Sequence, residues 1–217
     1  MSFFHAGPAP RAFGPRPGAL RDGLHLTSGM RVGLFGGSFN PAHDGHAHVA
    51  ETALSRLGLD RVVWLVSPQN PLKDARETAS LEDRMTSACA QARGPAMVVS
   101  DAETRMGTRW TVDTLRALRE RHPGVRFVWL MGSDNLEGFD RWRGWTDIMR
   151  AVPVAVVARP GSLLESRAAP AARRFAFARV SSRKASLLPG MQAPAWTYLR
   201  APLNAKSSTA IRRQSGA

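Results

Sequence analysis

The stretch GGSFNPAHDGH, residues 36–46, places glycines and histidines between an apolar run and a helical pattern. Gly36 and Gly37 would let backbone N–H groups come close to a phosphate. His43 and His46 lie about one helical turn apart, so both imidazoles could donate hydrogen bonds to one anion. The positive end of the following helix would add roughly half a unit charge at the same place. The pattern therefore favours chemistry on a nucleotide phosphate.

Other interpretations of these residues remain open from their types and spacing. The glycine pair could form a turn and nothing more, and the histidines could be polar residues at the start of a helix. Zinc is a further possibility, with His48 or Asp44 joining His43 and His46, although no second group of ligands follows downstream. A P-loop is excluded, because no Gly-Lys-Ser or Gly-Lys-Thr follows the glycines.

Apolar runs along the chain predict the elements that would position this stretch. A strand is expected at 31–35 and a helix at 46–57, which Gly58 ends. Further strands are expected at 61–67, 96–100, 125–132, 153–159 and 196–200, with helices beginning near Ser80, Thr111 and Ser207. Strands separated by helix-length segments indicate βαβ units. We therefore expect an α/β fold with a Rossmann-like, doubly wound parallel sheet in a single domain.

Two segments lack such patterning. Residues 1–29 are rich in proline and glycine and show no sustained apolar period, so we expect a disordered N-terminal tail before a domain spanning 30–217. Residues 161–195 are rich in Ala, Arg, Ser and Pro and predict a long surface excursion.

Composition narrows the class of protein. The chain has 217 residues, of which 43% are hydrophobic, and this suits one globular domain. The formal charge of +13 comes from arginines spread along the chain, which favours a basic background over a nucleic-acid surface. A basic nucleic-acid-binding α/β protein remains the distant alternative.

The one cysteine, Cys89, fits a reducing compartment. Without an apolar run long enough for a membrane span or a signal peptide, we expect a cytoplasmic protein with no membrane or nucleic-acid partner. The oligomeric state is not indicated.

The motifs carry a family resemblance. GGSFNPAHDGH resembles the GGxFxPxHxGH signature of the nucleotidyltransferase superfamily of adenylyl- and cytidylyltransferases, and KSSTAIR, 206–212, resembles its ISSTxIR element. Between them, TRWTVDTL, WLMGSDNLEGFDRW and VARPG resemble segments of the bacterial nicotinate-nucleotide adenylyltransferases. The resemblance covers residues 31–215. It departs at Lys206, where an apolar residue is usual, and at Ser38, where threonine is common.

The resemblance implies a reaction in NAD biosynthesis. AMP would pass from ATP to the 5′-phosphate of nicotinate mononucleotide, giving deamido-NAD and pyrophosphate. The acceptor phosphate would attack the α-phosphorus in line without a covalent enzyme intermediate, so catalysis would consist of positioning and charge neutralisation. Mg²⁺ would accompany the phosphates with few protein ligands. Nicotinamide mononucleotide and phosphopantetheine are alternative acceptors, and the central segments disfavour the second.

The resemblance also implies roles for individual residues. His43, His46 and Arg212 would form the catalytic set. The expected ATP-binding residues are Gly36, Gly37, Ser38, Phe39, Gly132, Asp134, Ser207, Ser208 and Thr209. The expected acceptor-binding residues are Lys73, Trp110, Thr111 and Trp142, with Trp142 stacking on the pyridine ring. Three of these have plainer interpretations, because Trp142 could pack on the surface, Asp134 could cap a helix, and Lys73 could be a solvated charge.

Overall fold

One parallel sheet organises the protein in a computed structural model that describes residues 22–68, 78–159 and 168–200. Its seven strands lie in the order β3-β2-β1-β4-β5-β7-β6, and every pairing is parallel. The strands are β1 (Arg31–Gly37), β2 (Arg61–Val66), β3 (Met97–Ser100), β4 (Arg126–Gly132), β5 (Val154–Val157), β6 (Arg179–Val180) and β7 (Trp196–Leu199). The order reverses between β1 and β4, which is where ligands bind in doubly wound sheets. The expected α/β fold is confirmed.

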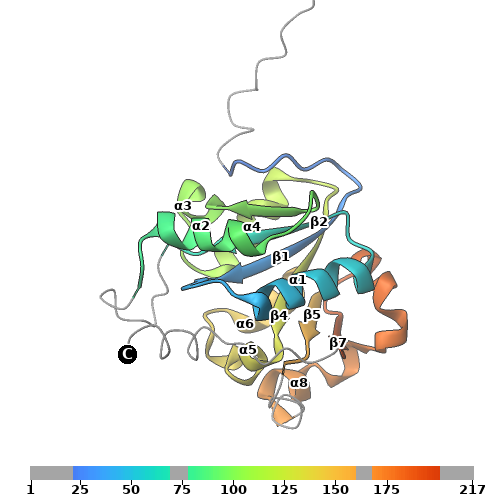
Figure 1. Ribbon diagram of the computed structural model, residues 1–217. Coiled ribbons are helices and arrows are strands. Elements are labelled where there is room, and N and C mark those ends of the chain that lie inside the picture. Colours follow the sequence, from blue (N-terminus) through green and yellow to red (C-terminus); the bar gives the residue numbers. More distant parts are fainter. Residues whose placement is uncertain (1–21, 69–77, 160–167, 201–217) are drawn as a thin grey trace, which may run out of the picture.

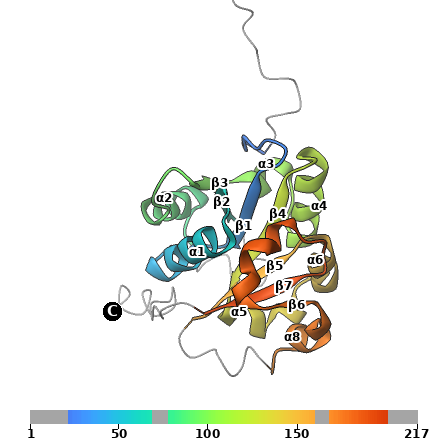
Figure 2. The same ribbon diagram turned by 90° about the vertical axis from the view of Figure 1, so that its right-hand side faces the viewer.

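Helices cover both faces of this sheet (Figures 1 and 2). One face carries α1 (Asp44–Leu57), α2 (Leu81–Gln91) and the 3₁₀ segment η4 (Ser182–Gly190). The other carries α3 (Ala102–Met106), α4 (Thr111–Arg121), α5 (Ser133–Glu137), α6 (Trp145–Ala151) and α8 (Pro170–Arg174). Two short 3₁₀ helices, η2 (Phe139–Arg141) and η3 (Ala176–Ala178), complete the described helices. Of these, α3 and α6 were not predicted, since five and seven residues are too few to show a helical period, whereas α5 was considered only as a helix that Asp134 could cap.

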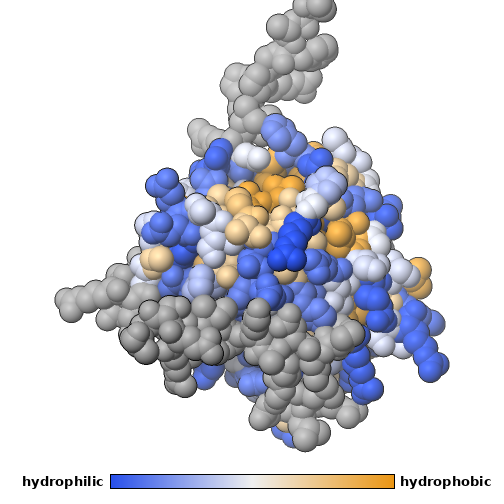
Figure 3. Space-filling model, viewed as in Figure 1, coloured by the Kyte–Doolittle hydropathy of each residue, from blue (hydrophilic) through white to orange (hydrophobic). Residues whose placement is uncertain are grey.

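The hydrophobic core is divided into two clusters by the sheet. Alternation along β1 sends Leu34 toward α4 and Phe35 toward α1, as period-two geometry requires. The central strands are therefore apolar on both faces, as expected for parallel strands buried between helices. Outside the core, hydrophilic residues surround a central apolar area on the face shown in Figure 3. No helix among the described residues is long and apolar enough to cross a membrane.

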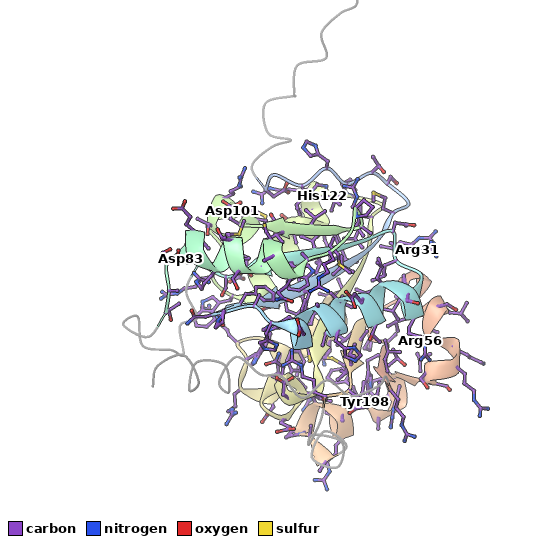
Figure 4. The ribbon with its side chains drawn as sticks, viewed as in Figure 1. Arg31, Arg56, Asp83, Asp101, His122 and Tyr198 are labelled. Carbon is purple, nitrogen blue, oxygen red and sulfur yellow. The ribbon has the colours of Figure 1, made fainter. Side chains whose placement is uncertain are left out.

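The predicted N-terminal tail is wrong for residues 22–29. Leu24 is 4% exposed and belongs to the core cluster beside α4, and Oδ2 of Asp22 lies 2.9 Å from Nε2 of His122. Figure 4 shows His122 on the side of the molecule where this segment crosses. Leu24 and Leu26, the contact between Asp22 and His122, and backbone hydrogen bonds of His25 and Gly29 attach the segment, and none of these produces a periodic pattern in the sequence. Residues 1–21 lie outside the described residues.

The predicted surface excursion is also wrong over 168–195. Phe175, Ala185 and Leu188 are buried in the two core clusters, and β6 extends the sheet beside β7. Phe175 ends the five-residue helix α8, and Ala185 and Leu188 lie in the 3₁₀ segment η4, so none of them belongs to a 3.6-residue period and the sequence gives little sign of them. The helix expected near Ser207 lies outside the described residues.

Candidate active site

The carboxyl ends of β1 and β4 carry most of the expected site residues that the structure describes. Gly36 and Gly37 are the last two residues of β1, where a turn had been expected. A Cβ atom on Gly36 would overlap the ring of Trp129 on β4, and one on Gly37 would lie 3.0 Å from the ring of Phe39. Close aromatic packing therefore requires both glycines. Their contact with phosphate stays a prediction.

Phe39 follows in an uncommon backbone conformation. Its φ is +46°, which few residues other than glycine adopt, and its side chain is 1% exposed. The ring packs at 5.0 Å from the His46 ring and at 5.2 Å from Trp64, measured between centroids. Any contact of Phe39 with a nucleotide would therefore be made by its backbone, while its ring supports His46.

The two histidines form the start of α1 together. His43 is the N-cap, and its Nδ1 accepts a hydrogen bond from the backbone N–H of Gly45 at 3.0 Å. Nδ1 of His46 accepts the backbone N–H of His43 at 3.3 Å, and the two ring centroids are 4.0 Å apart. Because each Nδ1 is an acceptor, the neutral form of each ring carries its proton on Nε2. The reciprocal capping thus fixes both rings and makes Nε2–H the donor of each, and a contact of either donor with phosphate stays a prediction.

The local electrostatics keep His46 neutral. Burial is the largest cause that lowers the pKa of His46 to about 2, and the neighbouring His43 and the positive charge of Arg159 contribute to the same shift. The expectation that a protonated imidazole supplies charge does not hold for His46 in this state. His46 instead presents a neutral donor, which can bind an anion without first losing a salt-bridge partner.

Gly132 and Asp134, expected near ATP, lie at the end of β4. Asp134 is not the N-cap of α5, because Gly132 occupies that position. Instead, Oδ2 of Asp134 lies 2.9 Å from Nη1 of Arg159, and the backbone N–H of Arg159 donates to Oγ of Ser133 at 2.7 Å. A Cβ atom on Gly132 would lie 3.0 Å from Nε of Arg159, so this glycine leaves room for the ion pair. Sequence reasoning assigned no role to Arg159, although it stands in the VARPG segment.

Three of the expected acceptor-binding residues lie on neighbouring elements. Trp110 is the N-cap of α4 and Thr111 its first residue. The guanidinium of Arg143 lies 5.4 Å from the Trp110 ring, and Arg143 directly follows Trp142. The structure therefore brings Trp110, Thr111 and the Trp142 segment to one region. Trp142 is half-buried against Phe139, at 5.3 Å between ring centroids. The plainer interpretation, in which this tryptophan packs on the protein, therefore holds, and its stacking on a pyridine ring stays a prediction.

A buried carboxyl group below this region was not predicted. Glu103 on α3 is 6% exposed, and its Oε1 accepts a hydrogen bond from Oγ1 of Thr114 at 3.0 Å. Oγ1 of Thr114 also lies 2.9 Å from Oγ1 of Thr108, so these side chains join α3 to α4 below Trp110. Burial raises the pKa of Glu103 to about 7, although the Thr114 hydrogen bond opposes this. The sequence gives no distinct signal for this pair, because Glu103 is an ordinary acidic residue that follows a strand and Thr114 is an ordinary threonine within a helix.

Five expected residues lie outside the described residues, so the structure does not place them. They are Lys73, Ser207, Ser208, Thr209 and Arg212. Within the described ranges, no group of three or more His, Cys, Asp or Glu side chains could hold a metal ion, and a zinc site at His43 and His46 is therefore not supported there.

Comparison with known proteins shows the family of the chain. A family model described as cytidylyltransferase-like matches residues 34–214. A protein of Caulobacter sp. (strain K31), named "Probable nicotinate-nucleotide adenylyltransferase", is 64% identical over 183 residues, covering 84% of this chain and 97% of that protein. A protein of the same name from Parvibaculum lavamentivorans is 52% identical over 191 residues, covering 88% and 95%.

A solved structure supports the fold. It is the Plasmodium falciparum nicotinic acid mononucleotide adenylyltransferase complexed with NaAD, which superposes with a TM-score of 0.64 at 15% identity and covers 84% of this chain and 82% of that one. At this identity the likeness concerns the fold alone. Together with the identity to the bacterial proteins over nearly their whole length, the matching motifs show that the chain belongs to the nicotinate-nucleotide adenylyltransferase family of cytidylyltransferase-like proteins.

Proposed function

We propose that this chain transfers AMP from ATP to the phosphate of nicotinate mononucleotide at the carboxyl ends of β1 and β4. The observation that carries the proposal is the reciprocal capping of His43 and His46, which puts the proton of each neutral ring on Nε2. The two ring centroids lie 4.0 Å apart. Two donors held rigidly by backbone hydrogen bonds need no reorganisation when charge builds on a departing pyrophosphate.

The positive charge at this site comes from the surroundings of the histidines. Arg159 is close enough to lower the pKa of His46, and it is held by Asp134 on one side. Asp134 is about half exposed, so its second oxygen can also accept a ribose hydroxyl. The proposal extends to backbone contacts from Gly36 to Phe39. For Ser207, Ser208, Thr209 and Arg212, it rests on the SSTxIR resemblance alone.

The acceptor would occupy the region of Trp110, Thr111 and Trp142. The N-terminus of α4 offers backbone N–H groups that lack partners within the helix, and these attract a carboxylate. The half-buried ring of Trp142 offers an aromatic face for the pyridine. Lys73 would add a cation on the phosphate side, which rests on its sequence position only.

Mg²⁺ would enter with ATP. The described residues at this edge supply N–H donors rather than a cluster of oxygen ligands, so the ion would be held by the phosphates of the nucleotide. It would neutralise phosphate charge as pyrophosphate leaves.

The test measures pyrophosphate release from ATP and Mg²⁺ with four acceptor conditions in parallel. Nicotinate mononucleotide should give rapid release, nicotinamide mononucleotide less, and phosphopantetheine none above the sample without an acceptor. Faster turnover with phosphopantetheine, or release that is independent of any acceptor, would overturn the proposal.

A further inference from the structure

Arg84 on α2 is a buried arginine whose guanidinium is surrounded by backbone carbonyl groups. Arg84 as a whole residue is 2% exposed. Nε donates to the carbonyl of Ala79 at 3.0 Å, Nη1 to those of Ser38 at 3.0 Å and Ser67 at 2.6 Å, and Nη2 to that of Pro68 at 2.9 Å. In the part of the chain that the structure describes, no carboxylate forms an ion pair with Arg84. Among the described residues, four carbonyl dipoles therefore surround this charge.

Burial of this guanidinium carries a cost in free energy that its carbonyl partners must offset. A buried charge is costly without an opposite charge, and an apolar side chain of similar size would avoid that cost. Burial does lower the pKa of Arg84, yet an arginine remains charged at any physiological pH. The site thus keeps a permanent positive charge beside the loop that follows β1.

The four carbonyls belong to three separate segments at the carboxyl edge of the sheet. Ser38 is in the loop after β1, Ser67 and Pro68 follow β2, and Ala79 precedes α2. In Figure 4, Asp83 in the first turn of α2 lies on the side opposite Arg31, which begins β1. A single planar group therefore fixes the spacing of three segments where the parallel strands end.

A second contact from α2 holds the same loop farther along. Ser87 lies three residues after Arg84 and so on the same face of the helix, and its Oγ accepts the backbone N–H of Ala42 at 2.9 Å. Arg84 and Ser87 thus hold the backbone on both sides of Phe39. A residue with φ of +46° persists only where its surroundings fix it, and these two contacts supply that constraint.

Phe39 connects this constraint to the histidines. Its ring packs edge-on against His46, with 5.0 Å between centroids, and Ala42 directly precedes His43. A shift of Ser38 or Ala42 would therefore move both the aromatic support of His46 and the N-cap of α1. The Ser38 and Phe39 contacts thus connect the Arg84 guanidinium to His46.

We propose that Arg84 is a positioning residue for adenylyl transfer, which sets the conformation of residues 38–43 and so the aim of His43 and His46. The inference rests on the proposed function, because the proposed function assigns His43 and His46 to the phosphates. It predicts that changes at Arg84 impair kcat more than the KM for ATP, since binding contacts survive while the geometry at the reacting phosphorus is lost.

The first experiment compares Arg84→Lys and Arg84→Met with the unmutated chain. Lysine keeps the charge but has three donors in place of a planar set of five, so kcat should fall about tenfold. Methionine removes all donors, and kcat should fall about 100-fold or more, with a change in KM for ATP of less than about fivefold. Arg119→Met on α4 removes an exposed arginine and should leave kcat within twofold.

The second experiment separates positioning from plain stability. Arg84→Ala leaves a space that added guanidinium at millimolar concentration can occupy, and kcat should recover at least tenfold. Methylammonium at the same concentration, which lacks the planar donor set, should not restore it. Recovery of the melting temperature without recovery of kcat would overturn the proposal, and so would an Arg84→Met variant that keeps kcat within twofold.

A readout that needs no turnover distinguishes this inference from the proposed function. Amide hydrogen exchange over residues 38–46 should become at least tenfold faster in Arg84→Met, while exchange within β4 stays unchanged. If the unmutated chain releases no pyrophosphate from ATP and nicotinate mononucleotide, the proposed function fails regardless of this result. If it does turn over and exchange over 38–46 is unaffected by Arg84→Met, the positioning role alone fails.

Discussion

His43 and His46 fix each other's orientation at the start of α1: the backbone N–H of His43 donates to Nδ1 of His46 at 3.3 Å, and their ring centroids lie 4.0 Å apart. With Nδ1 of His43 also occupied by the N–H of Gly45, neither ring can present its Nδ1 to a ligand. The helix cap and the orientation of both imidazole rings are therefore one structure, and a change to one affects the other.

Replacing His46 with alanine should lower kcat about 100-fold or more, because it removes a preorganised donor at the place where charge develops. Pyrophosphate release at saturating ATP and acceptor measures this effect. His25→Ala, at an exposed position distant from the site, is the matched control and should retain full activity. A folded His46→Ala variant with unchanged kcat would remove His46 from the mechanism.

The low pKa of His46 predicts a pH dependence of stability. In the folded chain His46 resists protonation down to about pH 2, whereas in the unfolded chain the same histidine takes up a proton near pH 6.5. The contribution is thus fully present above pH 6.5 and declines as the pH falls from there toward 2. By pH 4 the free energy of unfolding should drop by up to about 3 kcal/mol from this group. Urea titrations of the unmutated chain and His46→Gln at pH 7 and pH 4 measure it, and equal drops in both would contradict the prediction.

Glu103 should have an opposite effect on stability. Its pKa of about 7 in the folded chain exceeds the 4.5 of an exposed glutamate, so the folded state keeps a proton that the unfolded state releases. Stability should therefore decline as the pH rises from about 4.5 to 7. Glu103→Gln keeps an oxygen for Oγ1 of Thr114 and should be more stable than the unmutated chain by about 1–3 kcal/mol at pH 8, with little difference at pH 4.5. Identical unfolding curves at pH 8 would show that Glu103 ionises at no cost.

The choice of acceptor should depend on the start of α4 rather than on Trp142. An amide would turn an N–H₂ donor toward the donors near Thr111, so nicotinate mononucleotide should exceed nicotinamide mononucleotide in kcat/KM by at least about tenfold. Trp142→Ala should weaken both acceptors and preserve their ratio, because stacking does not distinguish them. It should also lower the melting temperature, since Trp142 packs on Phe139. A changed ratio in Trp142→Ala would assign the selectivity to the tryptophan.

The attachment of residues 22–29 predicts a stability effect without a catalytic one. Leu24→Ala should lower the free energy of unfolding by about 2–4 kcal/mol, as expected for a leucine removed from a core. A chain beginning at Met30 should lose at least as much, because it also lacks Asp22 and its contact with His122. Chemical denaturation measures both changes, and kcat at 25 °C should stay within twofold. Unchanged unfolding midpoints would place Leu24 outside the core.

The sequence by itself predicted the main strands and helices of the sheet and singled out residues 36–46 as the candidate site. Apolar runs separated by helix-length segments define a parallel sheet, because the period of burial is a local property of consecutive residues. The glycines and histidines of residues 36–46 are likewise local, since the strand end, the N-cap and the first helical turn lie within one short stretch. Even there the reason for Gly36 was not predictable, because its partner Trp129 stands on another strand.

Tertiary structure decided every contact made between distant segments. Arg84 meets a carbonyl 46 positions earlier, and Arg159 meets Asp134 across 25 positions, so neither arginine differs in sequence from the others that give the chain its charge. The neutral state of His46 and the raised pKa of Glu103 also arise only on folding, because burial is a property of the packed chain. Leu24 shows the same limit, since one leucine in an irregular segment has no period and joins the core only through the shape of the surface beneath it.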